Sequence, residues 1–188
     1  MEKDYTGLPV SVPTAILKLG KTGAIKEVGL TDNLKFIVDN NVGKLAKWLR
    51  IMGYDTLFFD GRDDSRMIAT ALAEGRVILT RDTQIVRRRV VTNGQLKVIL
   101  ISSDEPEQQM HQVIDSLNLD CQFRPFAICL ECNQPLLERS KQQVKDLVPP
   151  YVFQTQSQYM ECPACHRIYW RGTHWQSMTE KLKKFMKG

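Results

Sequence analysis

The sequence predicts an α/β fold in which a mainly parallel β-sheet with flanking helices is followed by a small cysteine-rich module. From residue 35 onward, short apolar runs alternate with amphipathic segments of helical period. Acidic residues stand where predicted strands end, and two Cys-x-x-Cys pairs stand towards the end of the chain. These patterns divide the chain into an irregular lead-in (1–34), an α/β domain (35–122) and a cysteine module with a C-terminal helix (123–188).

Length and composition fit one ordinary domain with an appendage. The chain has 188 residues, of which 43% are hydrophobic, so it can bury a core. No apolar run approaches the roughly 20 residues that span a bilayer, and no signal-peptide pattern opens the sequence. We therefore expect a soluble, cytoplasmic protein with no membrane partner. The net charge of +5 weakly favours a polyanionic partner.

The first elements of the α/β domain follow from the spacing of apolar residues. The run Phe36-Ile37-Val38 predicts a strand over 35–39. Apolar residues three and four apart then predict a helix over 43–52, and Gly53 ends it. A second strand is predicted over 54–59.

The stretch from Asp64 to Asp82 is a helix followed by a strand. Apolar residues recur at helical spacing over 64–74, and Gly75 supplies the left-handed residue with which helices commonly end. A short buried strand over 77–79 then leads to Asp82. One acid therefore opens the helix, and the other closes the strand that follows it.

The rest of the domain continues the alternation. A short helix is predicted over 83–91, and a fourth strand over 97–101. Asp104 is expected to cap a last helix over 105–117, because Glu107 completes a capping pattern.

Three aspartates are predicted to converge. Strands that alternate with helices imply right-handed crossovers and a mainly parallel sheet, whose ligands bind beyond the carboxyl ends of the strands. If the first and third strands are neighbours, Asp39 and Asp82 face one crevice, and Asp64 reaches it from the start of its helix.

Carboxylates that lie so close need a compensating charge, which Mg²⁺ or Mn²⁺ with oxygen ligands supplies. Such an ion polarises a phosphodiester and activates water. Two alternatives remain open. An aspartyl nucleophile could carry out phosphate chemistry, or the acids only cap helices and lie in solvent.

Two segments carry a family resemblance. FIVDNNVGKLAKWLRIMGYDTLFF and DSRMIATALAEGRVILTRD resemble the PIN-like ribonucleases and, more narrowly, the Mut-seven C-terminal ribonuclease family. The resemblance runs from about residue 35 to the end of the chain. It implies a compact PIN-like domain, RNA cleavage that depends on Mg²⁺ or Mn²⁺, and a zinc ribbon behind the domain. The acids that match the family's catalytic, metal-binding positions are Asp39, Asp64 and Asp82. A further acid of the PIN pattern has no clear match, and Asp60 and Asp63 are the candidates.

The cysteines predict a second metal site. Two Cys-x-x-Cys pairs, Cys129/Cys132 and Cys162/Cys165, stand on either side of a spacer. Four thiolates in this pattern indicate a closed zinc site, which is structural rather than catalytic. Because a module of this size has little core, the metal is expected to supply much of its folding free energy. The fifth cysteine, Cys121, is expected to be a buried free thiol.

Basic and aromatic residues are candidate RNA contacts. They come from one face of the first helix, from the residues that follow the third strand, and from an aromatic, basic stretch after the second cysteine pair. The candidates are Lys44, Lys47, Arg50, Arg81, Arg87, Arg88, Trp170, Arg171 and His174. The alternatives are solvated helix faces, surface ion pairs, and packing of the cysteine module against the domain.

The sequence thus leads us to expect a metal-dependent ribonuclease that acts on RNA, single-stranded by preference, with a structural zinc ribbon that aids RNA binding. An adaptor that binds RNA or ribosomes with weak or no nuclease activity is the first alternative. A phosphatase or phosphotransferase for small phosphates is the second.

Overall fold

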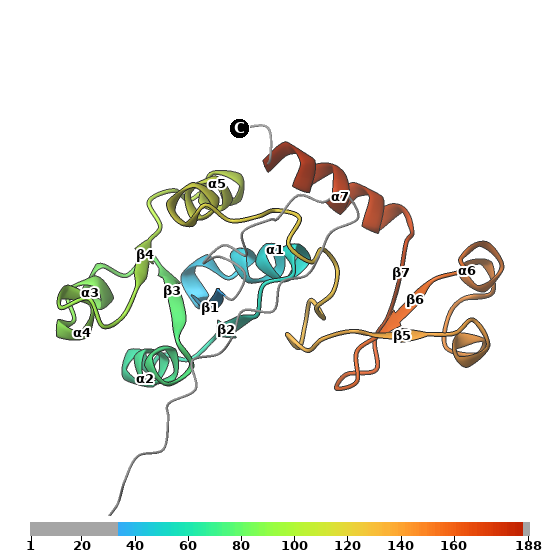
Figure 1. Ribbon diagram of the computed structural model, residues 1–188, viewed down its shortest axis with the longest axis horizontal. Coiled ribbons are helices and arrows are strands. Elements are labelled where there is room, and N and C mark those ends of the chain that lie inside the picture. Colours follow the sequence, from blue (N-terminus) through green and yellow to red (C-terminus); the bar gives the residue numbers. More distant parts are fainter. Residues whose placement is uncertain (1–33, 186–188) are drawn as a thin grey trace, which may run out of the picture.

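The computed structural model describes residues 34–185, which form an α/β domain and a smaller module (Figure 1). The lead-in expected before the first strand falls almost entirely outside this range. Over residues 34–185, no helix combines the length and the apolar character needed to cross a membrane. The predicted α/β class is confirmed.

Four parallel strands form the sheet of the α/β domain. They lie in the order β2-β1-β3-β4 and are β1 (Lys35–Asp39), β2 (Thr56–Phe59), β3 (Arg76–Thr80) and β4 (Val98–Leu100). β1 is hydrogen-bonded to β2 on one side and to β3 on the other, so Val38 lies opposite Phe58 and Leu79. The first and third strands are therefore neighbours, which meets the condition on which the expected crevice between Asp39 and Asp82 depends, and the strand order reverses between them.

Helices cover both faces of this sheet (Figure 1). One face carries α1 (Lys44–Met52), which the 3₁₀ turn η1 (Asn40–Val42) joins to β1, and α5 (Pro106–Leu117). The other face carries α2 (Asp64–Glu74), α3 (Thr83–Val86) and α4 (Arg89–Thr92). Within β1, Phe36 and Val38 belong to the first core and Ile37 to the second. Because both faces are buried, the strands have continuous apolar runs rather than alternating ones.

Two local features explain where helices end. Gly53 ends α1 with φ 93°, and a Cβ atom at this position would lie 2.3 Å from the carbonyl oxygen of Arg124. Only glycine therefore fits this turn. The helix predicted over 83–91 is divided into α3 and α4, because Arg88 between them has an extended backbone with ψ 139°.

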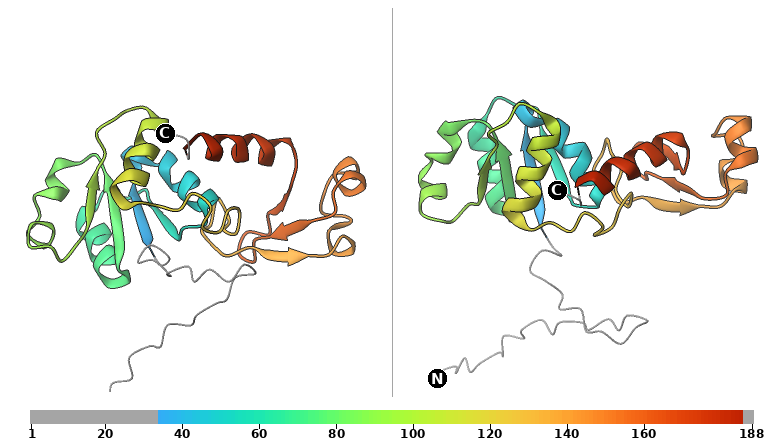
Figure 2. Two further views of the ribbon diagram at one scale, coloured as in Figure 1. Left: turned by 45° about the horizontal axis from the view of Figure 1, so that its top comes forward. Right: turned by 90° about the horizontal axis from the view of Figure 1, so that it is seen from above.

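The module is a three-stranded antiparallel sheet in the order β5 (Leu137–Arg139), β6 (Tyr159–Glu161), β7 (Ile168–Trp170). The turn η2 (Gln142–Val144) and the helix α6 (Pro150–Thr155) connect β5 to β6 around a small core that includes the buried Tyr159. The last helix, α7 (Thr173–Phe185), runs from the module back to the α/β domain (Figure 2). There the ring of Phe185 packs edge-on against Trp48 and His111, at centroid distances of 5.3 and 5.5 Å.

Arg50 joins the two parts of the structure. Its side chain is only 5% exposed. Nε donates to the carbonyl oxygen of Thr56 in β2 (2.9 Å), and Nη1 donates to those of Leu130 (2.7 Å) and Glu131 (3.1 Å) in the first cysteine loop. The prediction that Arg50 contacts RNA is therefore corrected, since the cysteine module covers this part of the α1 surface.

Asn133 makes a second link between the module and β2. With φ 60° it occupies the left-handed region. Its side-chain oxygen accepts from the amide of Thr56 (2.8 Å), and its Nδ2 donates to Asp55 Oδ1 (2.6 Å). β2 is an edge strand, and the side chain of Asn133 supplies the hydrogen-bond acceptor for the backbone N–H of Thr56 at its start.

Replacing Arg50 tests this joint. Arg50→Met keeps the side-chain bulk but leaves three carbonyl oxygens without their donor, so we expect the free energy of unfolding to fall by about 2–4 kcal/mol. The control is Lys47→Met, one turn earlier on α1, where an exposed ion pair with Glu131 (3.3 Å) is lost. This control should cost less than about 1 kcal/mol. Urea unfolding measures both, and equal losses would contradict the role given to Arg50.

Candidate functional site

Asp39 occupies the point where ligands bind in open α/β sheets. It is the last residue of β1, and it lies at the carboxyl edge where the strand order reverses between β1 and β3. Although it is charged, its side chain is only 8% exposed. A carboxylate in this position must be held by donors from its surroundings.

Three donors hold this carboxylate. Oδ1 accepts from the amide of Asn40 (2.7 Å), and Oδ2 accepts from Asn41 Nδ2 (2.8 Å) and from the hydroxyl of Thr80 (2.6 Å). A carboxylate offers about four lone-pair positions. Oδ1 therefore keeps one acceptor position for a ligand, while both oxygens are fixed in orientation.

Thr80 connects Asp39 to Asp82. Its hydroxyl donates to Asp39 and accepts from the backbone amide of Asp82 (2.9 Å). The Asp82 carboxylate caps α3 by accepting from the amide of Gln84 (2.7 Å), and it is half-buried. The Thr80 hydroxyl thus links the Asp39 carboxylate to the backbone of Asp82, whereas the Asp82 carboxylate is directed to the start of α3.

Asp64 lies at the same edge, in the first turn of α2, and is half-exposed. Its neighbour Asp63 is the N-cap and accepts from the amides of Ser65 and Arg66 at 3.0 and 3.2 Å. Among residues 34–185, the only group of three or more potential ligands close enough to share an ion is the set of four cysteines. The structure therefore places Asp39, Asp64 and Asp82 along one edge without gathering them into one ligand shell.

A cavity of about 380 Å³ opens at this edge. It lies between the start of α1 and the start of α5, and polar side chains line most of it: Asn40, Asn41, Lys44, Arg81, Asp104 and Gln109. Arg81 forms an ion pair with Asp104, and its backbone amide donates to Asn41 Oδ1 (3.2 Å). Two cations and several amides make the cavity suitable for a phosphate group.

Asp104 was not predicted as a site residue. The sequence suggested that it caps α5, but the N-cap position belongs to Glu105, which makes no side-chain cap hydrogen bond. Asp104 instead faces Arg81 across the cavity. Asp104 follows the carboxyl end of β4, and Asp39 stands at the carboxyl end of β1. This common position at strand ends is the signal that could have identified Asp104.

The other predicted RNA contacts lie outside this cavity. Lys47 pairs with Glu131. Arg87 and Arg88 are exposed at the junction of α3 and α4. A third set, Trp170, Arg171 and His174, belongs to the end of β7 and the start of α7, on the cysteine module side.

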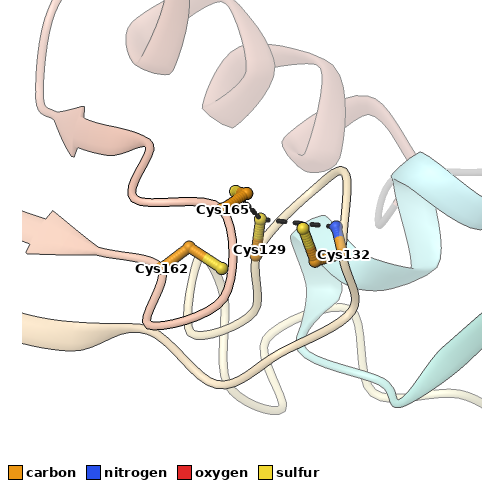
Figure 3. Close-up of side chains that lie close together, drawn as sticks. All are labelled: Cys129, Cys132, Cys162 and Cys165. Atoms are coloured by element: carbon orange, nitrogen blue, oxygen red, sulfur yellow. Dashed lines mark hydrogen bonds between the residues drawn. The ribbon is translucent and has the colours of Figure 1, made fainter.

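The four cysteines form a compact cluster from two loops (Figure 3). The sulfur atoms of Cys129, Cys132, Cys162 and Cys165 all lie within 4.8 Å of one another. The Cys129–Cys165 sulfur distance is 3.7 Å. In a tetrahedral site with Zn–S bonds of about 2.3 Å, neighbouring sulfurs are roughly 3.8 Å apart. The predicted tetrathiolate geometry therefore fits a zinc ion.

The surroundings of Cys129 favour its thiolate. Burial of the thiol raises its pKa, but hydrogen bonds from the Tyr169 hydroxyl and from the amides of Cys132 and Glu131 outweigh this and lower the pKa to about 6. The Tyr169 oxygen lies 3.1 Å from the sulfur and also accepts from the amide of Leu130 (3.3 Å). Metal binding requires a deprotonated thiol, so this residue is prepared as a ligand.

The residue after each cysteine pair supports the loop and does not replace a ligand. Asn133 and His166 both adopt left-handed backbones, with φ 60° and 57°. Their amides donate to the carbonyl oxygens of Cys129 (3.1 Å) and Cys162 (2.9 Å). The ring of His166 pairs with Glu161 at 3.0 Å.

Substituting one cysteine of the cluster tests the zinc site. We expect Cys162→Ser to abolish stoichiometric zinc binding, measured by atomic emission spectrometry, because three thiolates do not close the tetrahedral shell. The module should then lose its folded β-sheet signal in circular dichroism. Cys121→Ser, at a buried thiol outside the cluster, is the control and should retain zinc. Full zinc content in Cys162→Ser would show that the cluster is not the zinc site.

Comparison with known proteins adds the family. The family model described as Mut7-C RNAse domain matches residues 34–182, which is more than half of the chain and includes both the α/β domain and the cysteine module. No curated protein and no solved structure gives a significant match. The chain therefore belongs to the Mut7-C RNAse domain family, whose function is of the ribonuclease type.

Proposed function

We propose that the chain is a ribonuclease that depends on Mg²⁺ or Mn²⁺ and hydrolyses an RNA phosphodiester at the cavity between the starts of α1 and α5. The observation that carries the proposal is the Asp39 carboxylate, buried at the carboxyl edge of β1 and oriented by three donors beside that cavity. Membership of the ribonuclease family supports the same reaction class.

The roles of the side chains follow from their charge and position. Asp39 is the direct metal ligand, with its remaining acceptor position on Oδ1. Asp64 and Asp82 are the further catalytic acids at this edge. They would contact the metal through a water molecule or after a small movement of their side chains. Mg²⁺ commonly keeps several waters and uses one or two carboxylates together with substrate phosphates, so a closed shell of three aspartates is not required.

The substrate phosphate is held by cations of the cavity. Lys44 and Arg81 line it, and both are exposed enough to meet an incoming phosphate. Arg81 exchanges its partner Asp104 for the phosphate as the RNA enters. The metal supplies positive charge and acidifies the attacking water. Arg87 and Arg88 extend the positive surface along the strand, and the zinc ribbon holds RNA away from the cut.

Asp39→Asn tests catalysis directly. We expect cleavage of a 5′-labelled, single-stranded RNA in Mn²⁺ to fall at least about 100-fold, because the amide keeps the shape of the side chain but loses its charge. The matched control is Asp115→Asn, an exposed acid on α5 away from the cavity, which should cleave at the wild-type rate. Denaturing gel electrophoresis measures both rates. Cleavage that persists in Asp39→Asn contradicts the assignment.

One observation favours a second candidate. The three aspartates do not share a ligand shell, which suits an adaptor that binds RNA or ribosomes without cutting. This adaptor predicts wild-type RNA affinity, no cleavage with either metal, and no effect of Asp39→Asn. A phosphatase would instead turn over a chromogenic phosphate monoester and give no RNA products.

A further inference from the structure

A second cavity, larger than the one beside Asp39, lies in another part of the structure. Its volume is about 610 Å³, and it lies between the cysteine module, α7 and the loop that follows α5. Aromatic rings form its walls: Phe126, Tyr169, Trp170 and Trp175. The cavity takes no part in the reaction proposed above, and the zinc site does not require it.

The rings of this cavity leave polar groups available. Trp175 lies 5.1 Å from the ring of Phe126, and the guanidinium of Arg171 lies 5.3 Å above the Trp175 ring. Within residues 34–185, Arg171 forms no ion pair, and the indole N–H of Trp170 donates to no other group. An aromatic-walled space beside an arginine without an ion-pair partner and an indole N–H without an acceptor suits an aromatic, polar-edged ligand better than an aliphatic one.

The charge around the cavity favours a polyanion. Arg171 and Lys183 line it, Lys183 being paired with Glu180 (2.7 Å), and α7 adds the exposed Lys181 and Lys184. Glu138 is the only carboxylate among the residues that line the cavity. Aromatic faces with an arginine and lysines nearby are the combination by which proteins stack the bases of single-stranded nucleic acid and hold its phosphates.

We propose that this cavity binds an unpaired base of an RNA strand whose scissile phosphate lies in the cavity beside Asp39. The base stacks on Trp170 or Trp175, and Arg171 and Lys183 meet the adjoining phosphates. The proposal rests on the proposed ribonuclease function only for the identity of the strand, since the base-binding step needs no catalysis.

The distance between the two cavities sets the length of RNA required. Pro106 and Gln109, near the start of α5, line the catalytic cavity, and Cys121 and Gln122, just past the end of α5, line the aromatic one. A helix of 12 residues spans about 18 Å. At roughly 3.4 Å per nucleotide in a stacked strand, this corresponds to about five nucleotides. Shorter RNA cannot occupy both cavities unless its backbone is more extended.

Abasic substitution in the RNA gives a sharp test. The probes are a fluorescein-labelled five-nucleotide oligouridylate, which can span both cavities in a single register, and versions with one base removed at each position in turn. Binding to the full chain is measured by fluorescence anisotropy without added Mg²⁺ or Mn²⁺, so that the RNA stays intact. We expect loss of one particular base to weaken binding roughly 10-fold. Loss of the other bases should have much smaller effects.

A variant that fills the cavity completes the test. Thr179 lines the cavity one helical turn after Trp175, and Thr179→Phe adds bulk without changing charge. This variant should bind the intact five-nucleotide RNA as weakly as wild type binds the critical abasic RNA, and it should no longer distinguish the two. Lys145→Ala, at an exposed lysine of the module that does not line the cavity, is the control and should behave as wild type. Zinc content and circular dichroism establish that Thr179→Phe is folded, and Arg171→Ala, on an exposed side chain, provides a second variant if it is not.

The outcomes separate this proposal from the ribonuclease assignment. A flat abasic profile, or wild-type affinity in both variants, overturns the base-binding cavity, even if Asp39→Asn abolishes cleavage; such a result would leave a peptide segment as the better occupant. A position-specific abasic effect that disappears in Thr179→Phe supports the cavity, even if no cleavage is found.

Discussion

The buried guanidinium of Arg50 is the interaction on which the joining of the two parts depends. Burial lowers its pKa, while the sulfur atoms of Cys129 and Cys132 and the carboxylate of Glu131 act in the opposite direction. An arginine side chain stays charged even so. Four thiolates around Zn²⁺ carry net negative charge, and Arg50 is a cation beside them. One side chain therefore balances the zinc site, fixes the first cysteine loop and holds β2.

The module and the proposed chemistry lie at opposite edges of the sheet. Asn133 bonds to Asp55 and Thr56, where β2 begins, whereas Asp39 and Thr80 are the last residues of β1 and β3. The first cysteine loop thus contacts the amino edge of the sheet, away from the carboxyl edge where Asp39 and Thr80 lie.

Strand and helix positions in the α/β domain could be predicted because apolar periodicity reports burial directly. The cysteine cluster also followed from spacing, whereas the adjacency of β1 and β3 entered only as a condition and is supplied by the structure. Arg50 could not be placed, since periodicity assigns it with Lys44 and Lys47 to a polar face, and only the folded module covers part of that face. The Arg81–Asp104 pair and the spread of the three aspartates depend on loop paths, which apolar periodicity does not determine.

The hydroxyl of Thr80 orients one acid of this edge, Asp39. It donates to Asp39 from the neighbouring strand, so pairing of β1 with β3 sets the direction of that carboxylate before any ligand arrives. The backbone amide of Asp82 donates to Thr80, and its carboxylate caps the start of α3 by accepting from the amide of Gln84. A carboxylate held by three donors, with two further acids along the same edge, would suit an ion that keeps part of its water, because such an ion needs only one or two carboxylates as direct ligands.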